Sequence, residues 1–398
     1  MRAAFGVMVV VALAGCGGDD DDGPARDAAA VVDAAGPDAA GDPCAAGATC
    51  RVGRGLCAPT PYCSAAMPCP NALVGVMTNA TLSEPLTVPT CRTSVASRPQ
   101  FDDGAPRRWT DAPTGLERAA CVFRPAGGAP RPLLLFMHGS GGSAATMYDT
   151  TSLRSKATTY DFGTGAGAGF VLAADQGPNS PIPNGNPPSS RHEFYYRDPA
   201  SPSTNPDFRA LDRLIDDLVA EGGIDPRRIY LMGWSNGAFF SQAYGLARHA
   251  TATPGGNRVA AVIAFDGANP FAVPRATAMF DGCALDPLPQ VALPIMLIHR
   301  ACSIIPCDAA QAAAMTQPPG YEVAAWETTL RTQIGARDVT NIIVAGTGAT
   351  VSACTAAASC SAALATVNHI RWPDGVADGS GIDHEGEMLD YLRAHPLP

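Results

Sequence analysis

Short apolar runs recur between residue 116 and the end of the chain, and each is bounded by glycine, proline or polar residues. Such runs are typical of strands that are buried on both faces of a sheet. The segments that fit are residues 133–137, 169–174, 228–232, 259–265, 294–299 and 369–372. The pattern therefore predicts a set of short buried strands.

An amphipathic helix is predicted between the second and third of these strands. Phe208, Leu211 and Ile215 recur at helical spacing and share one face. Asn205 is a suitable N-cap for this helix, and Gly222 is suited to its end. Strands that alternate with helices favour an α/β fold, in which helices cover both faces of a mostly parallel sheet. We expect one such domain over residues 116–398.

The first 16 residues have the layout of a bacterial secretory signal, with Arg2 followed by an apolar run that is too short to span a bilayer. The run ends in Leu-Ala-Gly-Cys, which resembles a lipobox, and this resemblance implies cleavage before Cys16 and lipidation of that residue. A plain signal peptide is the alternative. Residues 17–43 are mainly Asp, Ala, Gly and Pro, a composition that predicts a disordered tether.

Most of the formal net charge of −10 lies in this tether, so the remainder is close to neutral. The chain lacks a basic patch for nucleic acid and a second apolar run long enough for a membrane span. We expect a secreted protein that meets the membrane only through its lipid and is held at the bacterial cell envelope. The single lysine, Lys156, leaves almost no material for Schiff-base chemistry or a phosphate-binding G-K-[ST] loop.

Thirteen cysteines are many for a chain of 398 residues, and the chain without Cys16 keeps an even number. This count predicts disulfides formed in an oxidising compartment. Zinc is the rival, but no C-x-x-C pair occurs, and we expect neither a metal nor an organic cofactor. Residues 44–115 form a Cys-rich segment in which the cysteines from Cys44 to Cys91 are expected to pair mainly with one another.

A candidate nucleophile follows the predicted strand 228–232. The sequence there is Gly-Trp-Ser-Asn-Gly, with Ser235 at its centre, and a helical pattern continues it. A strand, a tight turn and a helix form the nucleophile elbow of serine hydrolases, where glycines are needed because the turn leaves no room for a Cβ. A glycine-rich turn without chemistry is the alternative.

The turn after strand 133–137 is also rich in glycine and reads His-Gly-Ser-Gly-Gly. Backbone N–H groups at such a strand end can stabilise an oxyanion. We expect these donors at Ser140 or Gly141, together with the N–H of Asn236. We interpret His138 as a structural residue of the turn.

Seven histidines could supply the base, and in this arrangement the base follows the nucleophile in the chain. Of the four histidines that follow residue 290, His299 lies in a predicted strand, His369 begins one, and His395 is close to the chain end. His384 remains, in a Gly/Asp-rich loop before a predicted helix. We therefore predict His384 as the general base.

These segments resemble the polyhydroxybutyrate depolymerase and feruloyl esterase group of secreted α/β-hydrolases. The likeness is carried by residues 224–237, 134–139, 170–171 and 372–384 and by Trp326. It implies an α/β-hydrolase fold and a cofactor-independent serine esterase acting on a polyester, such as polyhydroxybutyrate, or on feruloyl or acetyl esters of polysaccharides. The alternatives are a peptidase of the same fold and a surface binding lipoprotein with impaired catalysis.

The chain departs from this group at the catalytic acid. The resemblance places an Asp four residues after a strand-end histidine, but that position, counted from His299, holds Ser303. Two carboxylates are candidates to replace it. Asp308 is preferred because it follows in the same loop, and a Cys302–Cys307 disulfide could fold that loop back. Asp266, which ends the preceding strand, is the alternative.

Overall fold

The computed structural model describes residues 49–51, 56–58, 86–113, 115–165, 167–180, 189–192, 194, 202–249, 257–271, 290–315, 320–345, 361–376 and 380–398. All of them belong to one compact unit, which begins at Gly41. The predicted lipidation site Cys16, the tether and about half of the Cys-rich segment lie outside the described residues. Within that segment, β1 (Thr49–Arg51) pairs antiparallel with β2 (Leu56–Ala58).

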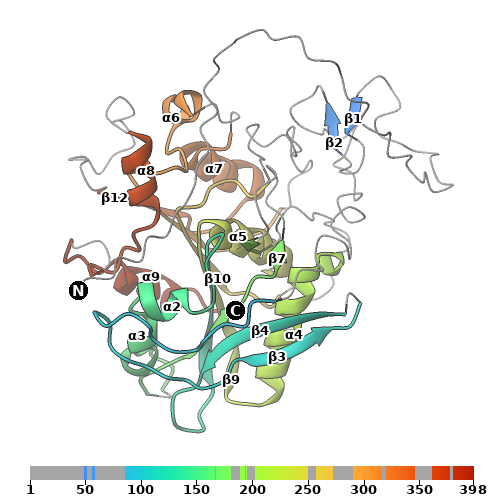
Figure 1. Cartoon of the computed structure of the whole chain (residues 1–398), viewed down its shortest axis with the longest axis vertical. Coiled ribbons are helices and arrows are strands. Elements are labelled where there is room, and N and C mark those ends of the chain that lie inside the picture. The colour runs from blue at the N-terminus through green and yellow to red at the C-terminus, as the bar shows by residue number, and fades with distance from the viewer. Residues whose placement is uncertain are drawn as a thin grey trace, which may run out of the picture. The chain divides into compact units, whose positions relative to one another are not determined.

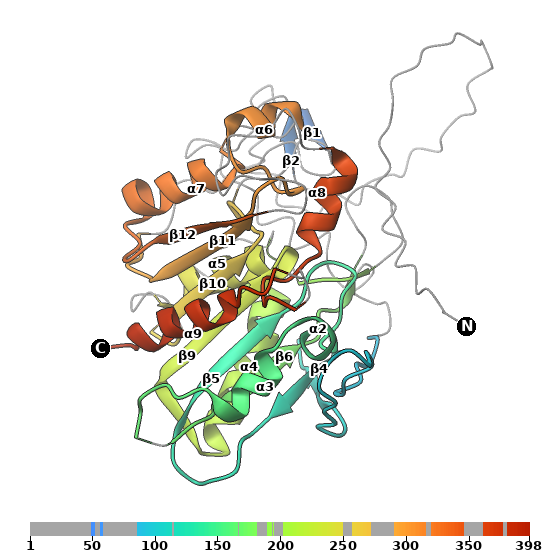
Figure 2. The same cartoon turned by 90° about the vertical axis from the view of Figure 1, so that its left-hand side faces the viewer.

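An eight-stranded sheet forms the centre of the unit (Figures 1 and 2). The order across it is β12-β11-β10-β9-β5-β6-β4-β3. The strands β5, β6 and β9 to β12 run parallel to one another. At one edge of the sheet, β4 pairs antiparallel with β6, and β3 pairs antiparallel with β4. Their bounds are β3 (Arg107–Asp111), β4 (Leu116–Phe123), β5 (Arg131–Met137), β6 (Val171–Asp175), β9 (Ile224–Trp234), β10 (Ala261–Phe265), β11 (Ile295–Arg300) and β12 (Thr340–Val344).

Helices cover both faces of this sheet. The helices of the described residues are α2 (Thr146–Thr150), α3 (Leu153–Thr159), α4 (Pro206–Ala220), α5 (Asn236–His249), α6 (Ala309–Ala314), α7 (Val323–Thr329), α8 (Ala362–His369) and α9 (His384–Ala394). Shorter elements are the 3-10 helix η1 (Pro202–Thr204), the π-helix η2 (Leu330–Ile334), and the paired strands β7 (Asn179–Ser180) and β8 (Ser189–Ser190).

Alternate residues of the central strands point into two separate cores. Leu133 and Leu135 of β5 pack with α4, α5 and α7 in one core. Leu134 and Phe136 pack with α2, α3 and α9 in the other, on the face that Figure 2 turns toward the viewer. Because the side-chain period of a strand is two residues, a strand that is apolar at every position is buried on both faces. This explains the continuous apolar runs in the sequence.

The strand order reverses between β5 and β9, because β6 lies on one side of β5 and β9 on the other. Such a switch point opens a crevice at the carboxyl ends of the parallel strands, where ligands bind in open α/β sheets. Strand order, strand directions and the two helical layers together make this an α/β-hydrolase fold, as the sequence predicted. The predicted helix between the second and third strands is α4, and Asn205 caps it by accepting from the N–H groups of Asp207 and Phe208.

Two predictions about the carboxyl-terminal part differ from the structure. Residues 369–372 do not form a strand, because His369 is the last residue of α8. The short apolar run that predicts a strand lies in a loop, in which Ile370 is exposed and Trp372 is fully buried. In the described part of the chain, the last strand is instead β12, at the sheet edge, whose mostly half-buried residues give only a weak apolar signal.

The amino-terminal edge also differs from expectation. The strand β3 belongs to the sheet although it lies before the predicted boundary at residue 116. Cys91 forms a disulfide with Cys121 of β4, so the expected pairing of Cys91 within the Cys-rich segment is wrong. Cys302 and Cys307 are also disulfide-bonded. Among the described residues, every helix is too short or too polar to cross a membrane.

Candidate active site

Ser235 occupies the turn between β9 and α5. Its φ of 55° lies in the left-handed region, which is costly for a residue with a side chain. Hydrogen bonds hold it there, because its N–H donates to Phe265 O at 3.0 Å and its carbonyl accepts from the N–H of Ala238 at 2.8 Å. The side chain remains partly exposed. The turn therefore presents a serine hydroxyl at the carboxyl end of the central strand.

The glycines on both sides of Ser235 are required by close packing. A Cβ on Gly233 would lie 2.1 Å from Gly237 O, and a Cβ on Gly237 would lie 2.1 Å from Met137 O. Both distances are far below van der Waals contact, so any side chain would force the elbow away from β5. The local sequence is thus fixed by the approach of α5 to the end of the neighbouring strand.

His369 is the imidazole that lies beside Ser235. Its Nε2 is 2.8 Å from Ser235 Oγ, and its Nδ1 is 2.9 Å from Asp266 Oδ2. Asp266 follows the last residue of β10, and the register places Phe265 beside Trp234, so both strands deliver their next residue to the same edge. Three elements that are distant in the sequence thus form a hydroxyl–imidazole–carboxylate chain.

Two residue assignments made from the sequence are corrected by this geometry. His384 begins α9, and its Nδ1 pairs with Glu387 Oε2 on the same helix at 2.9 Å, whereas the imidazole at Ser235 belongs to His369. Asp308 caps α6, where its Oδ1 accepts from the N–H of Gln311 at 2.9 Å. Asp266, the alternative acid, is the carboxylate that contacts the imidazole. The sequence pattern around His369 predicts the start of a strand, where the base of this arrangement is not expected, so the sequence does not single it out.

Ser303 lies at the same junction although it is not an acid. Its Oγ donates to Asp266 Oδ2 at 2.6 Å and lies 3.3 Å from His369 Nδ1. The position that the family resemblance assigns to a carboxylate is therefore occupied by a hydroxyl that binds one. The carboxylate itself reaches the same imidazole nitrogen from the neighbouring strand.

Asp266 is fully buried, so its protonation state depends on the groups that contact its carboxyl oxygens. Nδ1 of the buried His299 lies 2.7 Å from Asp266 Oδ1, without the alignment of a hydrogen bond. Burial by itself would raise the pKa of Asp266, but the charges and contacts of His299 and His369 outweigh it and hold this pKa well below its ordinary value. Asp266 is thus ionised, and an ionised carboxylate requires a proton on Nδ1 of His369.

The backbone around His369 is fixed by side chains from other elements. Trp234, next to Ser235, donates its Nε1–H to the carbonyl of His369 at 2.9 Å. Asn368 donates from Nδ2 to Cys302 O at 2.8 Å, which ties α8 to the loop after β11. The imidazole is therefore held by the segments that carry Ser235 and Ser303.

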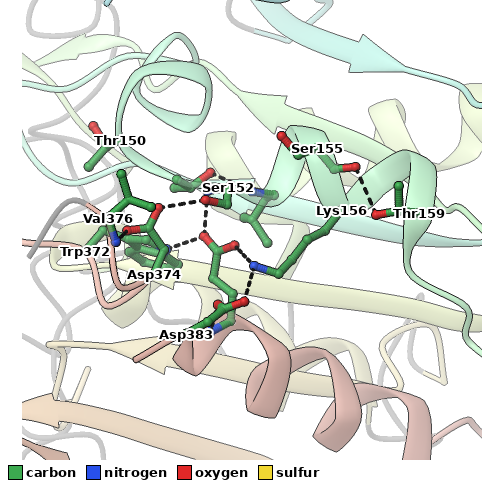
Figure 3. A network of polar contacts seen from close by, with 12 residues as sticks. Thr150, Ser152, Ser155, Lys156, Thr159, Trp372, Asp374, Val376 and Asp383 are labelled. Atoms are coloured by element: carbon green, nitrogen blue, oxygen red, sulfur yellow. Dashed lines mark hydrogen bonds and ion pairs between the residues drawn. The ribbon is translucent and has the colours of Figure 1, made fainter. Parts of the chain in front are cut away.

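A polar network around the buried Glu385 anchors the loop that continues from His369 (Figure 3). Trp372 donates its indole N–H to Glu385 Oε1 at 2.6 Å, and Lys156 Nζ lies 3.0 Å from Glu385 Oε2 and 2.7 Å from Asp383 Oδ2. Glu385 is fully buried, and burial raises its pKa although the Lys156 charge opposes this. The only lysine of the chain therefore joins α3 to the start of α9 and to the loop after His369.

The glycine-rich turn after β5 lies against the elbow. A Cβ on Gly139 would be 3.2 Å from the Ser235 Cβ. Of the two predicted oxyanion donors in this turn, Gly141 donates its N–H to Ser190 O at 2.8 Å, and Ser140 is exposed. Asn236, the third predicted donor, begins α5 and is buried. The turn and the elbow thus meet at Ser235.

His138 supports this turn from inside the protein. It is fully buried, its Nδ1 lies 2.7 Å from Gly139 O, and its Nε2 accepts from the N–H of Gly177 at 3.0 Å. Burial, with a smaller effect from His192, lowers the pKa of His138 to about 3. His138 is therefore a neutral structural residue, as its sequence context suggested. In the described part of the chain, no three His, Cys, Asp or Glu side chains are grouped as metal ligands.

The neutral state of His138 predicts a loss of stability in acid. Its folded-state pKa of about 3 lies below the unfolded value of roughly 6.5, so the unfolded chain binds the extra proton between these values. This group should lower the free energy of unfolding by about 1.4 kcal/mol per pH unit from pH ~6.5 downward, and contribute nothing above that. Urea titrations at several pH values, compared between wild type and His138→Asn, test this. Equal pH slopes for the two proteins would contradict it.

Comparisons with known proteins show distant likenesses to several solved structures. No family model matches it, and no curated protein sequence does. Among solved structures, it is similar to a thermostable esterase, with 17% identity and a TM-score of 0.41 over 75% of this chain and 66% of that one. It is also similar to acyl-protein thioesterase 2 from Zea mays (14%, TM-score 0.36, 57% and 89%) and to acetyl xylan esterase from Aspergillus awamori (12%, 0.34, 50% and 74%). At these identities and scores, the likenesses do not determine a reaction.

Proposed function

We propose that the protein is a serine hydrolase that cleaves carboxylic esters through an acyl-enzyme. The observation that carries this proposal is the unbroken contact chain from Ser235 Oγ through His369 to the ionised Asp266. A serine hydroxyl becomes a nucleophile when a base accepts its proton, and an imidazole between hydroxyl and carboxylate is the arrangement that does so.

In the proposed reaction, Ser235 Oγ attacks the ester carbonyl while His369 Nε2 takes the hydroxyl proton. The tetrahedral intermediate collapses when His369 gives this proton to the departing alcohol. A water molecule then attacks the acyl-serine, with His369 again accepting and returning one proton, and the carboxylic acid leaves. Asp266 holds the imidazole in the Nδ1–H tautomer and stabilises the imidazolium, without accepting a proton itself.

Two backbone N–H groups are proposed to stabilise the negative oxygen of the intermediate. One belongs to Asn236, at the first turn of α5, where backbone donors lack helical acceptors. The other belongs to Ser140, since the N–H of Gly141 already donates to Ser190 O. Both sit on segments adjacent to Ser235.

The substrate class proposed from the sequence resemblance is a polyester, such as polyhydroxybutyrate, or a feruloyl or acetyl ester of a polysaccharide. The idea of a binding protein with impaired catalysis arose from the missing acid at Ser303. The contact of Asp266 with His369 removes that reason. Lipidation at Cys16, secretion and attachment to the cell envelope remain proposals supported by the amino-terminal sequence pattern alone.

Labelling with a fluorophosphonate, together with ester turnover, tests the proposed function. The purified full chain should label at Ser235 and hydrolyse at least one member of a panel of nitrophenyl, feruloyl, acetyl-sugar and hydroxybutyrate esters. Ser235→Ala should abolish labelling and lower kcat by about 10³-fold or more, because it removes only the reacting oxygen. A wild-type protein that neither labels nor turns over any ester would overturn the proposal.

The choice of base is tested by a matched pair of histidine substitutions. His369→Gln should lower kcat by about 10³-fold or more, because it removes the group that takes the Ser235 proton. His384→Gln should leave kcat within about threefold, because that side chain pairs with Glu387 instead. Steady-state kinetics on the best nitrophenyl ester measure both. The reverse ranking would restore His384 as the base.

The choice of acid is tested in the same way. Asp266→Asn should lower kcat by about 10³ to 10⁴-fold with KM little changed, because the imidazole loses its tautomer and its counter-charge. Asp308→Asn is the matched control and should alter neither kcat nor stability, since asparagine caps a helix as well as aspartate does.

A third variant separates a missing acid from a damaged fold. In the Asp266→Asn background, Ser303→Asp should recover part of the lost kcat, because the side chain at 303 lies 3.3 Å from His369 Nδ1. Full activity of Asp266→Asn alone would show that the enzyme works without this carboxylate.

A further inference from the structure

The side chain of Asn236 makes a paired contact with another segment. Its Oδ1 accepts from the N–H of His192 at 2.7 Å, and its Nδ2 donates to the carbonyl of the same residue at 3.0 Å. Asn236 is 6% exposed, so these bonds are made away from solvent. The oxygen and the nitrogen of the side-chain amide are thus both hydrogen-bonded to the backbone of one residue.

The segment that Asn236 holds is also bonded to the turn after β5. Ser190, two residues before His192, accepts the Gly141 N–H on its carbonyl at 2.8 Å. The Ser190 hydroxyl donates to Gly177 O at 2.8 Å and accepts from Gln176 Nε2 at 2.6 Å. Residues 189–192 therefore form a bridge, with Asn236 at one end and the Gly141 turn at the other.

The bridge contacts a turn that lies beyond the last hydrogen-bonded residue pair of β5 and β9. The register between β5 and β9 ends with Met137 beside Gly233. Gly141 lies four residues beyond Met137, in a turn with a φ of 76°. The N–H groups of Ser140 and Asn236 belong to different elements, and an oxyanion requires both at hydrogen-bond distance from one point. Their relative position needs a support besides the sheet ladder.

We propose that the Asn236 side chain is a positioning residue that aligns the two halves of the oxyanion hole through the bridge formed by residues 189–192. This inference rests on the proposed function and deepens it. The backbone N–H of Asn236 contacts the oxyanion, and the side chain of the same residue fixes the distance to the second donor. Asn236 thus does two separable tasks, and a side-chain substitution removes only one.

Loss of this alignment should weaken the binding of the transition state and leave the binding of the ester substrate nearly unchanged. Hydrogen bonds to the oxyanion form fully in the tetrahedral intermediate and only weakly in the bound ester, so a misplaced donor lowers kcat and leaves KM nearly unchanged. Removing an entire oxyanion donor costs about 10² to 10³-fold in kcat. Displacing one without removing it should cost about 10- to 100-fold.

The test uses Asn236→Leu, which keeps the side-chain volume but loses both bonds to His192, and Asn236→Ala. For each, kcat and KM are measured on a nitrophenyl ester, and Ki is measured for an alkylboronic acid, which forms a tetrahedral adduct with the serine. We expect kcat to fall about 10- to 100-fold, KM to stay within about twofold, and Ki to rise by the same factor as kcat falls.

Asn205→Ala is the matched control, because Asn205 is a buried asparagine whose side chain also accepts backbone N–H groups, at the start of α4. It should lower the melting temperature and leave kcat and the boronate Ki unchanged. If the Asn236 variants do not fold, Ser190→Ala decides the question from the other end of the bridge. It removes the hydroxyl bonds to Gly177 and Gln176 and should give the same parallel change in kcat and Ki, of smaller size.

Three results separate failure of the inference from failure of the function. A wild-type enzyme that labels with fluorophosphonate and turns over ester, with Asn236 variants of unchanged kcat and Ki, would overturn the positioning role alone. Variants that raise KM without changing the boronate Ki would do the same. A wild-type protein without labelling or turnover would overturn both proposals together.

Discussion

The buried carboxylate of Asp266 is the interaction around which the site is assembled. A charge without solvent is costly unless polar groups surround it, and here His369, His299 and Ser303 supply them. These partners come from α8, β11 and the loop after β11. Contacts with one carboxylate therefore hold three segments together. His369 reaches Ser235 because its other nitrogen is committed to this carboxylate.

Asp266 and Ser303 follow two neighbouring strands, and both contact the same imidazole nitrogen. The ends of β10 and β11 are neighbours, so a carboxylate on either can approach Nδ1 of His369. In this chain, β10 supplies the carboxylate and β11 supplies Ser303, which binds it. The loop after His369 is fixed in turn by Glu385 and Lys156 (Figure 3). The imidazole is thus constrained from both directions along the chain.

The elbow at Ser235 depends on a different constraint, which is space. Gly233, Gly237 and Gly139 allow α5, β9 and the turn after β5 to approach until no Cβ fits or only a tight one does. Packing of this kind fixes the elbow itself, whereas the outer turn at Gly141 is held by hydrogen bonds to residues 189–192. Close packing therefore supports the elbow, and directed hydrogen bonds support the outer turn.

The sequence alone determined the features that are encoded locally. Continuous apolar runs identified β5, β6, β9, β10 and β11, and the glycines around Ser235 identified the elbow, because burial on two faces and absence of a Cβ both restrict residue type at adjacent positions. The tertiary structure alone decided the partners of Ser235. His369 lies 134 residues after Ser235 and 103 residues after Asp266 along the chain, and neither His369 nor Asp266 belongs to a local pattern. Their pairing follows from which strand ends lie side by side, and spacing in the sequence does not encode that.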